Sequence, residues 1–237
     1  MSRRRWIADE VTGNRAVLVG EHAQHLSRVL RARVGQEFDI SAEGVVRRGR
    51  ISRIRDDRVE FELGEQIPPS NSLQLTLALA IFKFDRMEWG IEKCTELGVS
   101  RIVPLIAART DAQLAKAAVK RRERWQRIAR EASEQSRRAA VPEIAVPLPL
   151  KEAVVLSART RLLLAESEKK ALLTDVLRGH SRNEEIMLAI GPEGGWTASE
   201  ANLFQQSGWI SVSLGETVLR AETAAIAATA IVASVLR

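Results

Sequence analysis

The sequence is poor in the residues that build disulfide bonds and metal centres. It contains one cysteine, Cys94, and three histidines among 237 residues. A single cysteine excludes an internal disulfide and a cysteine-based zinc site, and it fits a reducing compartment. His22 and His25 form an isolated i, i+3 pair without the ligand spacing of a metal centre, so we expect no bound metal.

Long apolar runs are also missing. The longest, TAAIAATAIVASVL (223–236), is shorter than the roughly 20 residues of a membrane helix and rich in alanine, which predicts a buried helix. The basic N-terminus MSRRRWIADE has no apolar stretch after it and does not resemble a signal peptide, so we expect a cytoplasmic protein. Tyrosine is absent and Phe and Trp together number ten, so recognition of bases by aromatic stacking would be sparse.

Positive charge is concentrated in the middle of the chain. The formal net charge is +6, and residues 71–140 carry 14 basic and 8 acidic groups. Residues 116–138 alone carry 9 basic and 3 acidic groups, on a predicted helix whose apolar face contains Trp125, Ile128 and Ala129. A solvated, salt-bridged face is the simple interpretation, but a surplus of six charges favours a nucleic-acid surface.

The two ends of the chain show different periodicities. The first 65 residues contain the strand-like runs RAVLV, EFDIS, VVRRGRISRI and RVEFEL, with a tight turn expected at Asp56-Asp57. One helix, EHAQHLSRVLR, interrupts them, and this pattern is typical of a small β-barrel. The polar, proline-containing segment EQIPPSNS (65–72) predicts a linker.

After residue 72, strands alternate with helices, which predicts a mostly parallel α/β sheet flanked by helices. The expected strands are 73–81, 101–106, 160–166, 184–190 and 209–213, and the expected helices are 85–98, 113–139, 170–179, 197–206 and the stretch from about 220. Ligands of open α/β sheets bind at the carboxyl ends of the strands, so the strand-to-helix loops carry the functional interest.

The loop IGPEGGW (190–196) lies between an expected strand and an expected helix, where Thr197 and Glu200 have the spacing of a capping box. A glycine-rich turn there suggests a phosphate cradle, but the spacing matches neither GxxxxGK[ST] nor GxGxxG. Pro192 lacks an N–H donor and the Glu193 carboxylate would repel a phosphate. A cationic ligand or a purely structural turn remains open.

A second loop and helix start, LGETVLRAETAAIAA (214–228), follows the last expected strand. Glu222 in the first turn is ordinary helix-dipole chemistry, whereas Arg220 at the same end is disfavoured. We therefore expect an anionic group near Arg220. The alanine-rich remainder suits close packing in a core or at a subunit interface.

Five stretches together resemble one family and occur in its order: HLSRVLRARVG (25–35), KFDRMEWGIEKCTELGVSRIVP (83–104), ERWQRIAREASEQSRRAAVPEI (123–144), IGPEGGW (190–196) and LGETVLRAETAA (214–225). The chain resembles the RsmE family, the 16S rRNA uracil-N3 methyltransferases of the SPOUT superfamily. The resemblance implies an N-terminal PUA-like, RNA-binding β-barrel over residues 1–68 and a trefoil-knotted SPOUT methyltransferase domain over 72–237. It also implies a homodimer, 16S rRNA or the small ribosomal subunit as partner, and S-adenosylmethionine as methyl donor.

The resemblance further implies that three loops after consecutive strands hold the donor. Carried onto this sequence, the donor-binding residues are Leu164, Ala165, Glu166, Ile190, Gly191, Pro192, Glu193, Gly194, Gly195, Leu214, Gly215, Val218, Leu219, Arg220, Thr223 and Ala224. The expected catalytic residues are Arg220, which would stabilise negative charge on a uracil oxygen, and Glu222. Proton removal by Glu222, by Glu193 or by water stays open. Glu216-Thr217 stand where the family usually has Pro-Arg.

Phosphate contacts to RNA are expected from the basic residues of both halves, namely Arg5, Arg28, Arg31, Lys83, Arg86, Arg121, Arg124, Arg137 and Arg138. Two alternatives remain at this stage. One is a ribose 2′-O-methyltransferase of the same fold acting on tRNA or rRNA. The other is a non-catalytic RNA-binding or ribosome-assembly protein.

Overall fold

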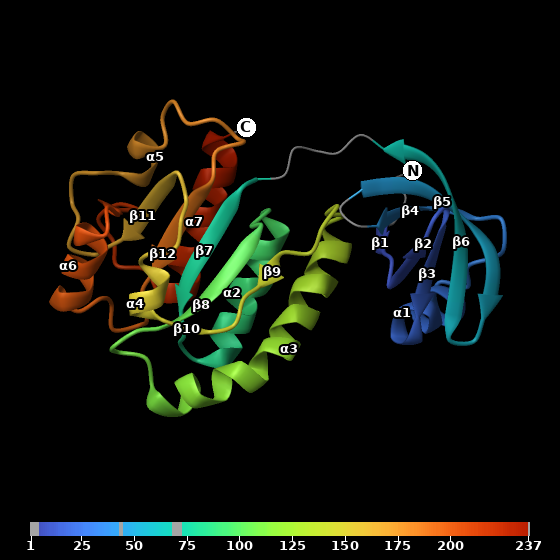
Figure 1. The fold of residues 1–237 in the computed structure, drawn as a ribbon, viewed down its shortest axis with the longest axis horizontal. Coiled ribbons are helices and arrows are strands. Elements are labelled where there is room, and N and C mark those ends of the chain that lie inside the picture. Colours follow the sequence, from blue (N-terminus) through green and yellow to red (C-terminus); the bar gives the residue numbers. More distant parts are fainter. Residues whose placement is uncertain (1–4, 43–44, 68–72, 237) are drawn as a thin grey trace. The chain divides into compact units, whose positions relative to one another are not determined.

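The computed structural model describes residues 5–42, 45–67 and 73–236. The chain forms two compact units, which are considered separately (Figure 1). Unit 1 contains residues Met1–Ser70 together with Ser133–Ala140, and unit 2 contains Asn71–Ala132 and Val141–Arg237. The predicted linker lies mostly outside the described residues, and its first part, Glu65–Ile67, continues a strand instead.

Unit 1 is built on a curled six-stranded sheet. Its strands are β1 (Arg5–Ile7), β2 (Glu10–Thr12), β3 (Arg15–Val19), β4 (Glu37–Ala42), β5 (Val45–Arg55) and β6 (Arg58–Ile67), in the order β1-β4-β5-β6-β3-β2. The four predicted strands and the turn at Asp56-Asp57 are confirmed. β1 and β2 escaped prediction because three residues are too few to show alternation. The predicted helix consists of α1 (Gly20–Gln24) and a π-helical turn, η1 (His25–Val29).

The sheet curls because its two edge strands are consecutive in the chain. Only Ala8 and Asp9 separate β1 from β2; the Ala8 N–H donates to the Ser41 carbonyl and the Asp9 N–H donates to the Val17 carbonyl. Gly49 on β5 lets the curled sheet close tightly, since a Cβ there would lie 2.3 Å from Ile40 Cγ1. The result is a curled half-barrel around a small core.

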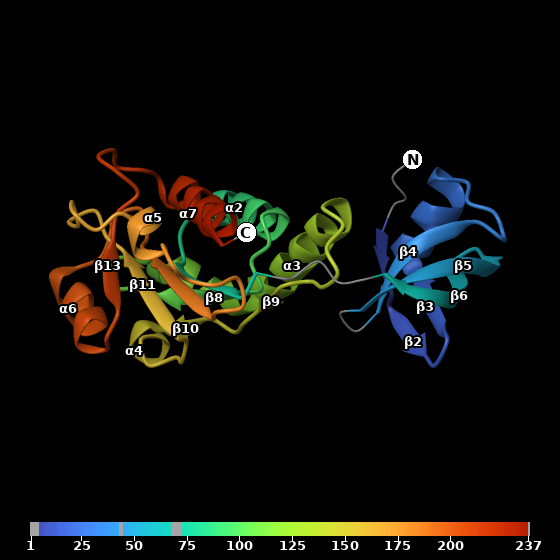
Figure 2. The same cartoon turned by 90° about the horizontal axis from the view of Figure 1, so that it is seen from above.

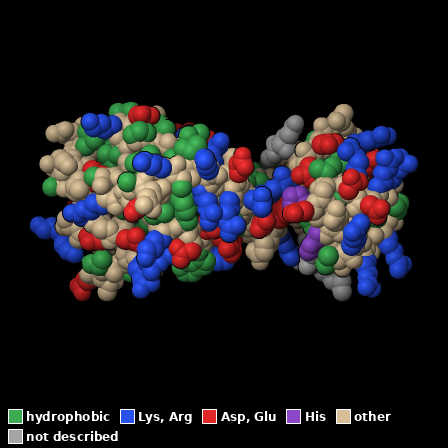
Figure 3. Space-filling model, turned by 90° about the horizontal axis from the view of Figure 1, so that it is seen from below, with side chains coloured by type: hydrophobic (Ala, Val, Ile, Leu, Met, Phe, Trp, Pro, Cys, Tyr) green, Lys and Arg blue, Asp and Glu red, His purple; other side chains and the backbone are tan. Residues whose placement is uncertain are grey.

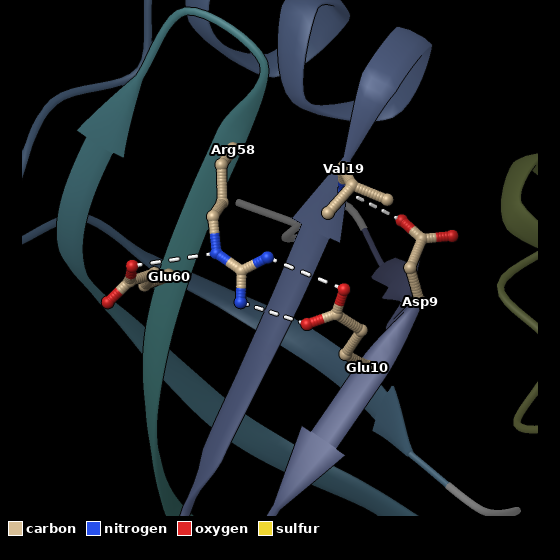
Figure 4. Close-up of polar contacts among 5 residues, drawn as sticks. All are labelled: Asp9, Glu10, Val19, Arg58 and Glu60. Carbon is tan, nitrogen blue, oxygen red and sulfur yellow. Dashed lines mark hydrogen bonds and ion pairs between the residues drawn. The ribbon is translucent and has the colours of Figure 1, made fainter.

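Side-chain contacts hold the β2 edge in place (Figure 4). The Val19 N–H donates to Asp9 Oδ2 at 2.9 Å. Arg58 on β6 donates to both Glu10 oxygens, at 3.4 and 2.9 Å, and its Nε lies 3.6 Å from Glu60 Oε1. The hydrogen bond to Glu10 raises the pKa of the Arg58 guanidinium above its usual value. These contacts protect an otherwise unpaired strand edge.

Residues 133–140 belong to unit 1 although no sequence pattern assigns them there. The Ser41 hydroxyl donates to the Ala139 carbonyl and the Arg5 guanidinium donates to the Arg137 carbonyl. The imidazole of His22 lies between carboxylates, 3.5 Å from Asp9 Oδ2 and 3.7 Å from Glu134 Oε1. These contacts join segments that are far apart in the sequence.

The long basic helix is shorter than predicted. α3 spans Ala112–Gln135, so the prediction of a helix to residue 139 is wrong at its C-terminal end. Arg137 adopts φ = 59°, a left-handed conformation that ends helical structure. Arg137 and Arg138 therefore do not extend the polar face of the helix. The predicted apolar face is confirmed, since Trp125, Ala129 and Ala132 are buried.

Unit 2 contains a parallel sheet in which the predicted strands all occur. Its strands are β7 (Leu75–Ala80), β8 (Arg101–Ile106), β9 (Glu143–Ile144), β10 (Leu148–Pro149), β11 (Thr160–Leu164), β12 (Ile186–Ile190) and β13 (Ile210–Val212). The order is β10-β8-β7-β12-β11-β13, with β9 paired to β8, and every pairing among the described strands is parallel. Because β7, β12 and β11 are central, their side chains are buried on both faces.

Helices cover both faces of this sheet (Figure 2). They are α2 (Phe84–Glu96), α3, α4 (Leu150–Ala153), α5 (Leu173–Val176), α6 (Ala198–Gln206) and α7 (Ala221–Val235). One core cluster joins the sheet to α2, α3, α5 and α7, and the other joins the opposite face to α4 and α6. α2 ends where Gly98 adopts φ = 109°, as predicted, whereas α5 is shorter than the predicted helix 170–179.

The alanine-rich C-terminal run forms α7, and much of it packs into the core of unit 2. Ala225, Ala228 and Val232 are fully buried, and α7 packs closely against α2. The predicted buried helix is thus confirmed. In the ranges that the structure describes, we find no helix with the length and apolarity to cross a membrane.

Candidate active site

A cavity of about 530 Å³ lies at the carboxyl ends of β11, β12 and β13. Its walls are the three loops that follow these strands. Carboxyl ends of neighbouring parallel strands meet at one edge of a sheet, which brings the three loops together despite their separation in sequence. Two of these loops are the glycine-containing stretches that the sequence singled out.

The predicted donor-binding residues converge on this cavity with two exceptions. The predicted residues that line it are Leu164, Ala165, Glu166, Ile190, Gly191, Pro192, Glu193, Gly194, Gly195, Leu214, Gly215, Val218, Leu219 and Ala224. Arg220 and Thr223 do not line it. Both side chains are exposed, Arg220 at the N-cap position and Thr223 in the first turn of α7.

The GPEGG loop is a tight turn with two close contacts. The Gly195 N–H donates to the Pro192 carbonyl at 2.8 Å, and Gly195 adopts φ = 68°. A Cβ on Gly191 would lie 3.2 Å from the Trp196 indole, and a Cβ on Gly194 would lie 3.1 Å from Arg109 Cδ. The glycines therefore allow an indole and a guanidinium stem to pass close to the backbone.

Trp196 connects the first two loops. Its Nε1–H donates to the Leu164 carbonyl at 3.0 Å, across from the end of β12 to the end of β11. Its ring packs edge-on against Phe204, at a centroid distance of 4.9 Å, and Phe204 packs in the same way against Trp209. Trp196 was not among the residues predicted for the site. Its place directly after GPEGG was the available signal.

Arg109 brings a fourth loop to the cavity. It follows β8, and its guanidinium donates to the Gly194 carbonyl. The turn that carries it is fixed by Thr110, whose hydroxyl accepts from the Ala107 N–H at 3.1 Å and donates to the Ile81 carbonyl at 3.2 Å. Arg109 could not be found from the sequence, because no local pattern indicates that the β8 loop reaches the loop after β12.

The predicted capping box at the start of α6 is confirmed, and it does more than cap the helix. Glu200 accepts from the Thr197 N–H at 2.8 Å and the Glu200 N–H donates to the Thr197 hydroxyl at 3.2 Å. The other Glu200 oxygen accepts from the Ala108 N–H at 2.7 Å. One buried carboxylate thus fixes both the helix that follows GPEGG and the turn that carries Arg109.

The two residues predicted to be catalytic lie outside the cavity lining. Arg220 is the N-cap residue of α7 and is exposed, and the expected anionic partner is not found among the described residues. Glu222 is buried, with a side chain 5% exposed, and faces Gly90 of α2. Its Oε2 has no hydrogen-bond partner in the described chain. Glu222 is thus a packing-face residue of α7.

Glu193 is paired with a basic residue from another element. Its Oε1 lies 3.3 Å from Arg86 Nη1, and Arg86 Nε lies 3.9 Å from Glu222 Oε1. Arg86, which was predicted to contact RNA, lies between these two carboxylates. Glu193 thus lines the cavity with its charge already partnered.

The remaining predicted RNA contacts are spread over both units. In unit 2, Arg121 and Arg124 share the carboxylate of Glu88, at 2.8 and 2.9 Å, and Lys83 is exposed as the N-cap of α2. Arg121 also lies over the Phe84 ring, 5.3 Å from its centroid. Figure 3 shows Lys and Arg side chains interspersed with carboxylates on the surface of each unit.

In unit 1, the predicted RNA contacts differ in exposure. Arg28 and Arg31 are exposed, and Arg28 Nη2 lies 3.8 Å from Asp56 Oδ1. Burial lowers the pKa of Arg5, and it lowers the pKa of Arg138 to about 10. Arg5 and Arg138 are therefore less available to phosphates than Arg28 and Arg31. No cluster of three His, Cys, Asp or Glu side chains suited to a metal occurs among the residues described.

Comparison with known proteins places these features in context. A profile of the RNA methyltransferase domain matches residues 69–233. The ribosomal RNA small subunit methyltransferase E of Synechocystis is 38% identical over 206 residues, which cover 84% of this chain and 66% of that protein. The protein of the same name from Rickettsia conorii is 32% identical, covering 88% of this chain and 85% of that protein.

Two solved structures have the same fold over nearly the whole chain. A Legionella pneumophila methyltransferase in complex with the cofactor SAM superposes with a TM-score of 0.84 at 29% identity, covering 99% of this chain and 98% of that one. The ribosomal RNA small subunit methyltransferase E of Neisseria gonorrhoeae, bound to S-adenosyl methionine, also has a TM-score of 0.84, at 30% identity, covering 97% and 96%.

Proposed function

The chain belongs to the family of ribosomal RNA small subunit methyltransferase E, and on this premise we propose that it methylates 16S rRNA with S-adenosylmethionine, at N3 of a uridine. The observation that carries the proposal is the cavity at the ends of β11, β12 and β13, which is lined by the loops that the family resemblance assigned to the donor.

The cavity fits S-adenosylmethionine in size and charge. Its volume of about 530 Å³ lies in the range of small-molecule sites, roughly 300 to 1,000 Å³. Glu166, Glu193 and Glu216 line it against the two cations Arg109 and Lys169. Because Glu193 also pairs with Arg86, the lining has no excess of positive charge to hold a nucleotide phosphate, and its carboxylates tolerate a ligand with a sulfonium and an ammonium group. Backbone groups of the glycine-rich turns are available to recognise the adenosine part.

When bound, the donor supplies an electrophilic methyl group. The chain has two tasks in the transfer: to hold the uracil N3 in line with that methyl group, and to stabilise negative charge on a uracil oxygen as the N3 proton leaves. Arg220 is suited to the second task because it is exposed at the cavity rim, next to the lining residues Leu219 and Ala221, and its guanidinium has no partner among the described residues. Glu222 is 5% exposed and does not line the cavity, so it is the weaker candidate for accepting the proton.

The family resemblance adds three structural proposals: a PUA-like barrel over residues 1–68, a knotted domain over 72–237 and a homodimer. The curled sheet of unit 1 supports the first. For the second, the loop after β11 pairs in parallel with the end of β13 through Leu172 and Ser213: the Leu173 N–H donates to the Ser213 carbonyl at 2.9 Å and the Ser213 N–H donates to the Ala171 carbonyl at 2.8 Å. This pairing ties the loop after β11 to the last strand, as the proposed knot requires. A substrate in the ribosome implies a cytoplasmic location.

Contact with rRNA phosphates is proposed for the exposed basic residues on the two units. The strongest candidates are Arg28, Arg31 and Lys83, which are exposed. Arg121 and Arg124 both pair with the Glu88 carboxylate, which offsets part of their combined positive charge. The half-buried Arg5 and Arg138 are weaker candidates, and Arg137 is held through its carbonyl rather than its side chain.

The proposal is tested on rRNA from cells that lack the protein. Primer extension and nucleoside mass spectrometry should show the loss of one N3-methyluridine in 16S rRNA, and the purified protein with S-adenosylmethionine should restore it on small subunits. Loss of a ribose-methylated nucleoside instead would indicate a 2′-O-methyltransferase. An unchanged modification profile together with no calorimetric binding of S-adenosylmethionine would indicate a non-catalytic RNA-binding protein.

A further inference from the structure

One guanidinium connects a wall of the cavity with the buried face of α7. Arg86 extends from the first turn of α2, and its Nη1 lies 3.3 Å from Glu193 in the GPEGG loop. Its Nε lies 3.9 Å from Glu222 in the first turn of α7. Glu193 follows β12 and lines the cavity, whereas Glu222 lies in the first turn of α7 outside the lining, so the two carboxylates belong to different segments around the site.

The Glu222 carboxylate depends on this contact. Its side chain is only 5% exposed, it packs against α2 at Gly90, and its Oε2 has no hydrogen-bond partner in the described ranges. Burial disfavours the charged form of a carboxylate, and a nearby cation offsets that cost. Arg86 is the cation that the structure places next to Glu222. Removing it would leave the buried carboxylate with only the helix N-terminus to stabilise its charge, in the turn of α7 that begins with Arg220.

We propose that Arg86 is a positioning residue of the methyl-transfer site, which fixes the GPEGG loop and the N-terminus of α7 relative to each other through Glu193 and Glu222. This inference rests on the proposed function. It assigns Glu193 the role of bracing the loop, and it removes Glu222 from the possible proton acceptors. It also replaces the sequence-based expectation that Arg86 contacts RNA.

The consequence is a coupling between donor binding and Arg220. Val218 and Leu219 line the cavity directly before Arg220, so a shift of the α7 N-terminus moves a wall of the donor site and the Arg220 guanidinium together. Misplacement by about 1 Å can reduce a rate on the order of 100-fold. Arg86 should therefore influence both the KM for the donor and kcat, although it does not line the cavity.

The test is a mutant cycle in the full-length protein with Arg86→Ala, Glu222→Gln and the double variant. We expect Arg86→Ala to weaken S-adenosylmethionine binding in calorimetry and to lower kcat on small subunits, each about 10-fold or more. Glu222→Gln removes the buried charge, so the double variant should recover much of both losses. Arg86→Lys should retain intermediate activity, because it keeps the charge without the forked geometry.

The matched control is Lys93→Ala on the same helix, which removes a surface pair with Glu92 and Glu96 and should leave donor binding and turnover unchanged. The proposal is overturned if folded Arg86→Ala binds the donor and turns over like the wild type. It is also overturned if Arg86→Ala weakens only rRNA binding and the added Glu222→Gln substitution does not restore it. Donor affinity and urea unfolding are measured without rRNA, so the coupling between Arg86 and Glu222 is tested even if the wild type methylates no rRNA.

Discussion

Arg109 donates a hydrogen bond to the carbonyl of Gly194, and this contact joins the loop after β8 to the GPEGG loop after β12. The aliphatic stem of the arginine passes so close to the glycine that a Cβ at residue 194 would lie 3.1 Å from Arg109 Cδ. The requirement for glycine at this position therefore arises from a side chain on another strand-to-helix loop and not from the turn itself, whose left-handed residue is Gly195.

This contact predicts a compensating pair of substitutions. Gly194→Ala should weaken donor binding, because the new methyl group displaces the Arg109 stem. Arg109→Ala should weaken it as well, through loss of a cation that lines the cavity. In the double variant the methyl group introduced at residue 194 has room. The loss of binding free energy in the double variant should therefore be about 1 kcal/mol smaller than the sum of the losses in the two single variants. Calorimetry with S-adenosylmethionine measures all four proteins, with Arg178→Ala as a control at an exposed pair. If the loss in the double variant equals the sum of the two single losses, the predicted close contact between the two residues is contradicted.

Trp196→Phe should separate the hydrogen bond of the indole from its packing. The phenyl ring still packs on Phe204, but the Leu164 carbonyl loses its donor at 3.0 Å. We expect a loss of roughly 1–3 kcal/mol in the free energy of unfolding by urea, from the unmet carbonyl, together with weaker donor binding. Trp89→Phe is the control, since that ring is 48% exposed on α2. Equal effects of the two substitutions would exclude a bridging role for Trp196.

Arg220→Ala should reduce catalysis far more than donor affinity. Arg220 does not line the cavity, whereas loss of a group that stabilises a developing oxyanion typically costs about 100- to 1,000-fold in kcat. Single-turnover methylation of small subunits measures the rate, and calorimetry measures the affinity. Wild-type turnover in a variant that binds donor and RNA normally would disprove the assignment.

Lys83→Ala should weaken RNA binding without affecting the donor. Lys83 is exposed and makes no contact with the cavity. Loss of one phosphate contact should reduce the slope of log K against log salt by about 1 and weaken binding uniformly across RNA sequences. Filter binding at several salt concentrations measures the slope. Arg101→Ala, which removes a surface pair with Glu143, is the control. An unchanged slope would remove Lys83 from the RNA surface.

Cys94 should be unreactive and should make stability depend on pH. Burial raises the pKa of its thiol to about 12, partly offset by a hydrogen bond from Thr229 at 3.4 Å. The folded protein therefore holds the proton that the unfolded chain releases above about pH 9. The contribution of this group to the free energy of unfolding is complete below that pH. It is lost as the pH rises towards 12, by at most about 1.4 kcal/mol for each pH unit.

The measurement compares urea unfolding of the wild type and Cys94→Ala between pH 8 and 10. The free energy of unfolding should fall more steeply with rising pH in the wild type than in Cys94→Ala, because only the wild type has the thiol. Arg138 affects stability in the opposite direction, because its pKa is lowered to about 10 in the folded state. Above about pH 10 the folded protein loses this proton before the unfolded chain does, so stability from this group rises with pH. Below about pH 10 Arg138 keeps its proton in both states, so the change in stability there reports on Cys94. In the native state at pH 8, thiol reagents should label Cys94 only as fast as the protein unfolds. Rapid labelling would contradict its burial.

Features that depend on neighbouring residues were predictable from the sequence. The alternating and apolar strands, the Gly98 stop after α2 and the capping box of Thr197 and Glu200 are all confirmed. Each is decided within a few residues by backbone conformation, side-chain period or a local hydrogen bond. Two of the three cavity loops carry motifs that the sequence singled out, the third was given by the family resemblance, and their meeting at one sheet edge follows from parallel pairing.

Contacts between distant segments were decided only by the tertiary structure. The sequence carried Arg86, Arg109 and Glu222 but gave no sign that the first would lie between two carboxylates, that the second would cross Gly194, or that the third would be buried against Gly90. Residues 133–140 likewise join the first sheet through contacts that no periodicity encodes. The physical reason is that a side chain's partner depends on how helices and strands pack, and packing brings together residues whose separation in the chain carries no local signal.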